Sequence, residues 1–277
     1  MRAAVVGHTE WIEFGRVERV PAPGDIVHAS GEWEEPGGGG AVASVQLARL
    51  AGSCTFFTAL GDDRIATMTR GGLARLGVRV RAVTRAEPSR RAVTLLDAAG
   101  ERTIITLGRR LETHASDHLP WDELDGTDAV YFTAGDADVL RLARRARVLV
   151  ATSRVMGVLR EGDVPLDAVV GSGRDPAEAY DPDGLSRPPG VVVRTDGIRG
   201  GSYETADGRN GRFDAVPPPS EIDDTYGAGD SFAAGLTYAL GAGLGLEEAL
   251  ELAARCGAWA ITGRGPYGNQ LTAAELS

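Results

Sequence analysis

The stretch DDTYGAGDSFAAGLTYAL, residues 223–240, joins a glycine-rich turn to a clear helical pattern. Apolar residues recur every four positions from Phe232 to Leu240, so the glycines before them stand at the N-terminus of an expected helix. The first N–H groups of a helix have no partner within it, and the helix dipole favours negative charge there. We therefore predict an anion-binding turn formed by the backbone of Gly227, Ala228 and Gly229.

An acid in this turn needs a chemical explanation. Asp230 follows the glycines directly, where a carboxylate would repel a bound phosphate. A general base accounts for it, because a carboxylate beside a hydroxyl group can accept its proton while the oxygen attacks phosphorus, a contribution of roughly 10² to 10⁴ in rate. The alternative is an ordinary helix N-cap, for which aspartate is common. Asp230 is thus a candidate catalytic base.

The composition is that of a globular α/β protein. The chain has 277 residues, of which 43% are hydrophobic and 25% charged, and its 38 glycines indicate many tight turns. This length fits one large α/β domain, and we treat residues 1–277 as a single domain.

The charge pattern excludes several classes of partner and of active site. The formal net charge is −10 and no block of basic residues interrupts it, which argues against nucleic acid as a ligand. All 29 basic residues are arginine. A Walker A lysine, a protein-kinase lysine and a Schiff-base lysine are therefore excluded.

Cysteine usage and hydropathy favour a cytoplasmic protein. Cys54 and Cys256 lie in apolar stretches, which predicts buried thiols in a reducing compartment, with a single disulfide as the alternative. The first apolar run is too short for a signal peptide, and the longest uncharged stretch, residues 231–246, is too short and glycine-rich to span a bilayer. We expect no membrane partner.

Short runs rich in β-forming residues alternate with helical patterns along the chain. Their near-continuous apolar character is typical of parallel strands that are covered on both faces. Helical faces lie between them, for example from Val139 to Ala146 and from Leu246 to Ile261. The pattern predicts a three-layer αβα, doubly wound, mainly parallel sheet. The expected strands are residues 3–7, 54–60, 128–134, 147–152, 166–172 and 190–195.

Two segments break this alternation. Residues 21–40 and 90–108 look like extended strands joined by turns, and the second has the pattern of a hairpin that bends at residues 98–100. If both segments pair, they form a small β-sheet lid beside the large sheet.

The turn sequence resembles the C-terminal signature of the ribokinase-like (PfkB) family of carbohydrate kinases, which is written DTxGAGDxF. In that family the GAG backbone forms the anion hole for the transferred γ-phosphoryl group, and the aspartate deprotonates the sugar hydroxyl. The resemblance implies these roles for Gly227 to Gly229 and for Asp230. The matching residues are Asp224, Thr225, Gly227, Ala228, Gly229, Asp230 and Phe232.

Other segments extend the resemblance over nearly the whole chain. Residues 36–52 are similar to the family's glycine-glycine helix entry and residues 58–78 to its GxDxxG-type segment, and GERTI at 100–104 matches its lid. The resemblance implies a lid formed by segments at approximately 11–35 and 85–108. It also implies a nucleotide site formed by Thr195, Gly197, Gly200, Thr225, Gly227 and Gly229.

The resemblance implies an acceptor site at the other glycine-rich turn. Gly38 and Gly39 would let the backbone approach the sugar, while Val42 stands where the family commonly has a substrate-binding asparagine. Glu10 and Glu13 are the acids that follow the first strand, where the family usually has an aspartate that binds sugar hydroxyls.

The same glycines offer a different interpretation. Residues 38–43 satisfy the loose GxGxxA dinucleotide pattern of a Rossmann oxidoreductase. The residues before them, GEWEEP, are acidic and end in proline, where that motif requires a buried strand. The context therefore disfavours it.

The family's NxxE magnesium motif does not occur in this form, and two alignments of the motif with this chain are possible. One pairs Asp175 with Glu178 and keeps the glutamate; the other pairs Ser172 with Asp175. We prefer Asp175 and Glu178, acting on Mg²⁺ through water, since Mg²⁺ needs only one or two carboxylates. The resemblance further implies a site for a monovalent cation, K⁺, at Asp224.

The sequence thus predicts an ATP-dependent kinase that phosphorylates a hydroxyl of a sugar or sugar-like small molecule, with Mg²⁺ as cofactor. The alternatives are a nucleoside kinase on the same fold and a non-catalytic sugar or nucleotide sensor. A homodimer formed through the lid stays open as an alternative to a monomer.

Overall fold

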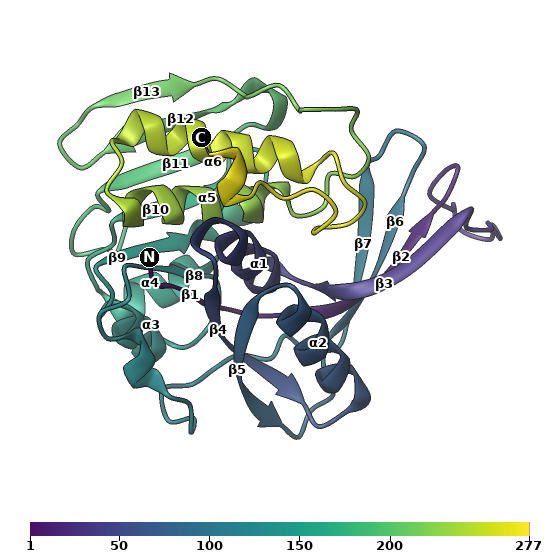
Figure 1. Ribbon diagram of the computed structural model, residues 1–277, viewed down its shortest axis with the longest axis horizontal. Helices are drawn as coiled ribbons and strands as arrows, with labels where there is room; N and C mark the ends of the chain where they lie inside the picture. The colour runs from purple at the N-terminus through teal and green to yellow at the C-terminus, as the bar shows by residue number, and fades with distance from the viewer. Residues whose placement is uncertain (277) are drawn as a thin grey trace.

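Six of the expected strands lie side by side in the centre of one large sheet in the computed structural model, which describes residues 1–276 (Figure 1). Their order is β11-β10-β9-β8-β1-β4, and every neighbouring pair is parallel. The expected mainly parallel sheet is confirmed. The strands are β1 (Ala3–Val6), β4 (Cys54–Gly61), β8 (Ala129–Phe132), β9 (Val148–Thr152), β10 (Ala168–Ser172) and β11 (Val191–Thr195).

Three edge strands complete this sheet and were not expected. β5 (Val78–Arg85) pairs with β4 in parallel, whereas β12 (Gly201–Thr205) and β13 (Asn210–Phe213) add an antiparallel extension at the other edge. Edge strands are covered less completely than central ones, so their sequences carry polar residues. β5, with the sequence VRVRAVTR, lacks the apolar run on which the strand predictions rested.

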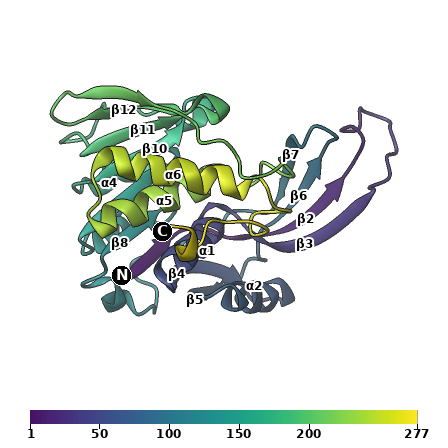
Figure 2. The same cartoon turned by 45° about the horizontal axis from the view of Figure 1, so that its top comes forward.

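Helices cover both faces of the sheet (Figure 2). Successive side chains of a strand point to opposite faces, so Val5 lies in one hydrophobic cluster and Val6 in the other. The first cluster contains residues of four helices, α1 (Gly39–Ala51), α2 (Arg64–Arg75), α5 (Ala228–Ala242) and α6 (Leu246–Ala260). The second contains residues of α3 (Ala137–Ala143) and α4 (Met156–Gly162). The three layers agree with the expected fold class.

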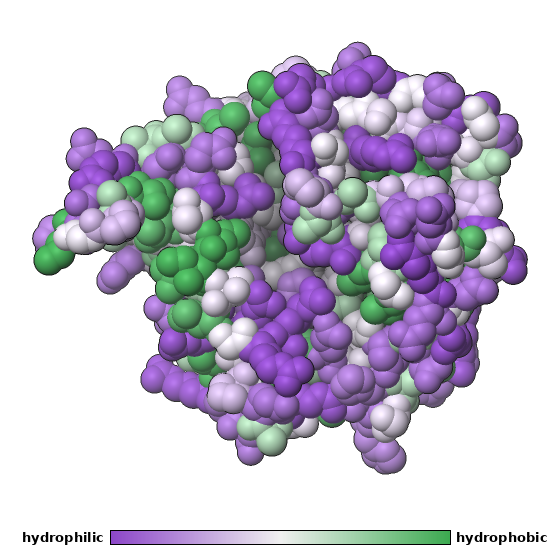
Figure 3. All heavy atoms as spheres, turned by 180° about the vertical axis from the view of Figure 1, so that it is seen from behind, coloured by the Kyte–Doolittle hydropathy of each residue, from purple (hydrophilic) through white to green (hydrophobic). Residues whose placement is uncertain are grey.

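A separate four-stranded sheet projects from the body and forms the lid (Figures 1 and 2). The hairpin expected at residues 98–100 is present, where the Gly100 N–H donates to the Asp97 carbonyl at 3.0 Å. Hydrophobic side chains gather on the lid side of the molecule (Figure 3). Ile104, Ile105 and Leu107 of the lid are exposed. In the order β3-β2-β6-β7, the strands are β3 (Gly31–Gly37), β2 (Glu10–Arg16), β6 (Arg91–Leu96) and β7 (Arg102–Leu107).

Both cysteines are buried and free, as expected. Within residues 1–276, no helix has both the length and the apolar character that a transmembrane span requires.

Candidate active site

The glycine-rich turn caps α5 without any side-chain hydrogen bond. Gly227 adopts a left-handed conformation, with φ of 79°, and its carbonyl accepts the first helical bond, from the Ser231 N–H at 2.8 Å. The N–H groups of Ala228, Gly229 and Asp230 have no acceptor within the described residues. They are therefore free to bind an anion at the positive end of the helix dipole.

Gly227 is held from behind by the body of the protein. A Cβ atom at this position would stand 2.9 Å from Cγ1 of Val42 and 3.3 Å from Pro266. Val42 itself has no exposed surface, so it packs beneath the turn rather than on the surface of the site. A valine suits this position because its methyl groups fill the space behind the turn.

Asp230 lies in the first turn of α5, against the N-terminus of α1. A Cβ atom on Gly39 would stand 2.8 Å from its Oδ1. Burial, followed by the negative charge of Glu178, raises the pKa of Asp230 to about 6. The guanidinium groups of Arg102 and Arg154 oppose this shift. A carboxylate with this pKa can both hold and release a proton near neutral pH.

The N-terminus of α1 meets the same carboxylate. Gly38 caps α1 with φ of 85° and no side-chain hydrogen bond, and its N–H donates to the Tyr226 hydroxyl at 3.0 Å. Tyr226 is buried inside the α5 motif, so this bond joins the two glycine-rich turns. Two helix N-termini that lack a side-chain cap bond thus meet at Asp230.

The two candidate glutamates of the first strand region occupy different environments. Glu10 is buried, its Oε2 lies 3.0 Å from Nε of Arg90, and burial raises its pKa against the effect of that arginine. Glu13 is exposed and lies 3.7 Å from Nη1 of Arg91. Of the two, only Glu10 is close enough to Asp230 to influence its pKa.

Two buried polar atoms near Glu10, Nδ1 of His8 and Oγ1 of Thr133, have no hydrogen-bond partner within residues 1–276. Burial and the nearby arginines lower the pKa of His8 to about 3, so its imidazole is neutral. Buried polar groups are normally paired, and two unpaired atoms at the carboxyl end of a parallel sheet point to a polar ligand. Glu10 Oε2 and Arg90 Nε do not form a hydrogen bond but lie 3.0 Å apart as an ion pair.

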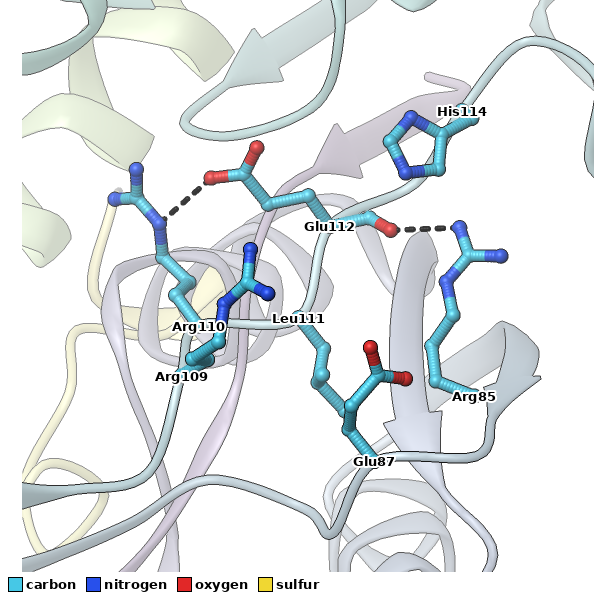
Figure 4. A pocket seen from close by; sticks show the side chains of 7 residues that line it. All are labelled: Arg85, Glu87, Arg109, Arg110, Leu111, Glu112 and His114. Atoms are coloured by element: carbon cyan, nitrogen blue, oxygen red, sulfur yellow. Dashed lines mark hydrogen bonds and ion pairs between the residues drawn. The ribbon is translucent and has the colours of Figure 1, made fainter.

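An arginine-lined pocket of about 330 Å³ adjoins this region (Figure 4). Its link to the site is Arg110, which donates to Glu112 at 2.8 Å and whose charge also acts on His8 and Glu10. The sequence did not predict it because its residues come from two separate segments, the start of the expected lid segment and the chain just after it. The lining residues are Arg85, Glu87, Arg109, Arg110, Leu111, Glu112 and His114.

Asp175 and Glu178 come together on an arginine that the sequence did not indicate. Nη2 of Arg154 lies 2.6 Å from Asp175 and donates to Glu178, whose other oxygen accepts from the Ser172 N–H at 2.6 Å. Ser172, of the alternative alignment, uses its own hydroxyl to accept from the Arg174 N–H. Among residues 1–276, no group of three His, Cys, Asp or Glu side chains could hold a metal ion.

Asp224 is fully buried and engages both of its oxygens. Oδ1 accepts from the Tyr226 N–H at 2.6 Å, and Oδ2 accepts from the Gly265 N–H at 3.0 Å. Burial raises the pKa of its carboxyl group, and the two backbone bonds oppose this shift. The carboxylate therefore fixes the loop that leads into the anion-binding turn.

Three of the remaining candidates for nucleotide contact, Thr195, Gly197 and Gly200, lie at the end of β11 and in the turn that follows it. Thr195 ends this strand, and Gly197 and Gly200 shape the turn to β12 with φ of 59° and 75°. A Cβ atom on Gly200 would stand 2.0 Å from the Phe213 carbonyl oxygen, so strand packing alone requires glycine there. Thr225 stands apart from this turn and accepts a hydrogen bond from Arg102 at 3.0 Å.

Comparison with known proteins gives one family and a consistent fold. A sequence model described as pfkB family carbohydrate kinase matches residues 2–158 and 178–273. The ATP-dependent ribose-1-phosphate kinase of Halopiger xanaduensis is 27% identical over 93% of this chain and 91% of its own. Ribokinase from Thermotoga maritima has a TM-score of 0.80 at 20% identity, covering 100% of this chain and 98% of that one. Arabidopsis thaliana ribokinase complexed with ribose and ATP has a TM-score of 0.74 at 21% identity, covering 95% and 93%.

Proposed function

Because this chain belongs to the pfkB family of carbohydrate kinases, we propose that it transfers the γ-phosphoryl group of ATP to a hydroxyl group of a sugar or sugar-like acceptor. Asp230 is the general base, and the backbone N–H groups of Gly227, Ala228 and Gly229 form the anion hole. Thr195, Gly197, Gly200 and Thr225 face the nucleotide.

One observation carries this proposal: a carboxyl group with a pKa of about 6 stands where two helix N-termini meet, each capped by a glycine without a side-chain hydrogen bond. A binding module gains nothing from an acid beside a phosphate site, whereas a kinase needs both a base and an anion hole. The free N–H groups stabilise the charge that develops on the transferring group, and they do so without reorganisation.

The proton moves from the acceptor hydroxyl to Asp230 as the oxygen attacks phosphorus. The attacking hydroxyl must lie within about 3 Å of the carboxylate, and Gly39 leaves that space open because it has no side chain. Glu10, His8 and the backbone of Gly38 are placed to orient the acceptor. His8 offers a buried nitrogen without a hydrogen-bond partner in residues 1–276, Glu10 offers a buried carboxylate, and Gly38 allows a close backbone approach.

The residues present fit Mg²⁺ as an outer-sphere ligand set. Arg154 occupies Asp175 and one oxygen of Glu178, so direct coordination has no preformed cage. Glu178 is nevertheless the charged group that acts most on Asp230, and Mg²⁺ commonly keeps several of its waters. When bound with ATP, the ion supplies charge neutralisation on the phosphates. Asp224 stays a proposed neighbour of a K⁺ ion.

The lid is placed to exclude water from this reaction. Phe14 of β2 packs edge-on against Tyr226, with ring centroids 5.4 Å apart, so the lid already contacts the anion-hole motif. Exclusion of water would keep ATP from being hydrolysed. The exposed apolar side chains of β7 support the further proposal of a homodimer through the lid.

The acceptor class is tested by coupled ADP release from the whole chain across neutral sugars, sugar phosphates, sugar acids and nucleosides. The Halopiger relative bears the name of a ribose-1-phosphate kinase, so ribose 1-phosphate belongs in the panel. Stimulation by a sugar or sugar phosphate supports the proposal, and stimulation only by nucleosides selects the nucleoside kinase. If ATP binds but no acceptor supports turnover, the non-catalytic sensor is the function that fits.

A further inference from the structure

One arginine at the site has no acidic partner. Three others are paired: Arg90 with Glu10, Arg110 with Glu112, and Arg154 with Asp175 and Glu178. Arg102 instead donates through Nη1 to two neutral groups of Thr225, the carbonyl oxygen at 3.1 Å and the hydroxyl at 3.0 Å. Within residues 1–276, no carboxylate forms an ion pair with it.

The fold places this uncompensated charge beside the anion hole. Thr225 precedes Gly227 by two residues, and Arg102 is near enough to Asp230 and Tyr226 to act on the charge of both groups. Arg102 begins β7, so it belongs to the lid, whereas the anion hole belongs to the body. Its guanidinium therefore bridges the two parts.

The tip of the lid is docked on the same loop. The Thr225 hydroxyl donates to the Gly100 carbonyl at 3.4 Å, and Arg16 of β2 lies 2.6 Å from Asp223. These contacts bring the bend of the β6-β7 hairpin over the residues just before the anion hole. The position of Arg102 thus depends on the lid being closed.

A phosphoryl group is a stronger partner for a guanidinium than a carbonyl or a hydroxyl. The bonds from Arg102 to Thr225 have only one charged partner, whereas a bond to a phosphoryl oxygen joins two opposite charges, and the planar fork of arginine matches phosphate oxygens. The chain has no lysine that could serve instead. A bound γ-phosphoryl group would therefore compete successfully with Thr225 for Arg102.

On this basis, which rests on the proposed function, we propose that Arg102 is a catalytic residue that leaves Thr225 and binds the transferring phosphoryl group from the lid side, opposite the backbone N–H groups of α5. Lid closure then completes the positive surroundings of the phosphoryl group. With the lid open, the charge is missing and ATP alone is poorly activated.

The first test measures binding and needs no acceptor. Calorimetry on the full chain compares the affinity for ADP with that for the β,γ-imido analogue of ATP, in the wild type and in Arg102→Gln. We expect the variant to bind the analogue at least about tenfold more weakly while ADP binding changes less than about twofold, because only the analogue carries a γ-phosphoryl group. Arg19→Gln, which alters an exposed arginine elsewhere on the lid that pairs with Asp25, is the matched control and should change neither affinity.

The second test measures turnover on the acceptor identified by the panel. Arg102→Gln should lower kcat by about 10²-fold with little change in the acceptor KM, and Arg102→Lys should restore part of the loss because it keeps the charge. The unfolding temperatures of both variants are measured as a control, and values equal to that of the wild type exclude misfolding as the cause of the loss.

The outcomes separate the two claims. If Arg102→Gln keeps the wild-type ratio of the two affinities, or keeps kcat within about threefold, the role of Arg102 is wrong while the kinase assignment stands. If the wild type binds neither nucleotide, both the proposed function and the proposed role of Arg102 are wrong.

Discussion

Oδ1 of Asp230 faces Gly39 so closely that a Cβ atom on Gly39 would stand 2.8 Å from it. The candidate base belongs to α5 and the glycine to α1, two helices that are almost 200 residues apart in sequence. Their N-termini meet at one carboxylate, and Tyr226 holds them together through its bond to Gly38. The absence of a side chain at Gly39 therefore defines the space in which an acceptor hydroxyl can approach Asp230.

Gly39→Ala should reduce activity far more than stability. The atom that the new methyl group meets is the end of a flexible side chain, which can rotate away, and alanine favours the helix by up to about 1 kcal/mol. A base displaced by about 1 Å costs roughly 10²-fold in kcat. Steady-state kinetics and thermal unfolding of the same preparation check both effects.

Gly40→Ala is the matched contrast. A Cβ atom there would stand 2.7 Å from the His8 carbonyl oxygen and 2.8 Å from the Phe56 ring, neither of which can move freely. We expect a loss of about 1–3 kcal/mol in unfolding free energy. Equal stability losses in the two variants would contradict this explanation.

Asp230→Asn should remove the base and leave the fold intact. The amide has nearly the same shape but cannot accept the proton, so kcat should fall by roughly 10² to 10⁴, while ATP still binds. Because burial raises the pKa of Asp230 to about 6, its charged form destabilises the fold above that pH, so the variant should also unfold at a higher temperature than the wild type at pH 8. Retention of full activity would remove Asp230 from the mechanism.

The pH profile of the wild type follows from the same residue. Because the pKa of Asp230 is raised to about 6 and the deprotonated form is the active base, kcat/KM for the acceptor should rise with pH below that value and level off above it. The residual activity of Asp230→Asn should lack this limb. A wild-type profile that is flat between pH 5 and 7 would assign the base to another group.

The sequence predicted the centre of the fold because that centre repeats simple signals. Six buried strands show up as apolar runs, and the glycine turn before α5 is marked by residue type and spacing. The three edge strands were missed because half-exposed strands need no apolar run, as the arginines of β5 show. The local sequence pattern therefore predicts strands that are fully buried and fails for strands at the edges of the sheet.

The charged surroundings of the site could not be predicted in the same way. Arg154 lies in no motif, Arg90 and Arg102 lie in the expected lid segment, and each reaches the site through contacts across 20 to more than 100 residues of sequence. Resemblance likewise suggested a cation ligand at Asp224, whose oxygens the structure shows bonded to two backbone N–H groups. Which side chains pair across distant segments depends on the tertiary structure, so short sequence patterns do not reveal these pairs.

A second acid with a strongly altered pKa lies behind the anion-hole loop. Glu35 of β3 accepts a hydrogen bond from Nε1 of Trp33 at 3.0 Å, and its Oε1 lies so near Gly265 that a Cβ atom there would be 2.0 Å away. Burial, opposed by the Trp33 bond and assisted by the charge of Asp224, raises the pKa of Glu35 to about 7. The lid strand therefore carries a carboxyl group that ionises near neutral pH.

Glu35→Gln should stabilise the protein in alkaline but not in acidic solution. The folded state holds this proton more tightly than the unfolded state does, because its pKa of about 7 exceeds the ordinary 4.5, so stability from Glu35 is present at low pH and is lost as the pH rises through about 7. Glutamine cannot ionise, yet its amide oxygen can still accept from Trp33. We expect a higher unfolding temperature than wild type at pH 8 and almost no gain at pH 4, below the ordinary pKa of 4.5, measured by calorimetry, with the exposed Glu32→Gln unchanged relative to wild type at both values. A gain of equal size at both pH values would mean that packing, not ionisation of Glu35, sets the difference.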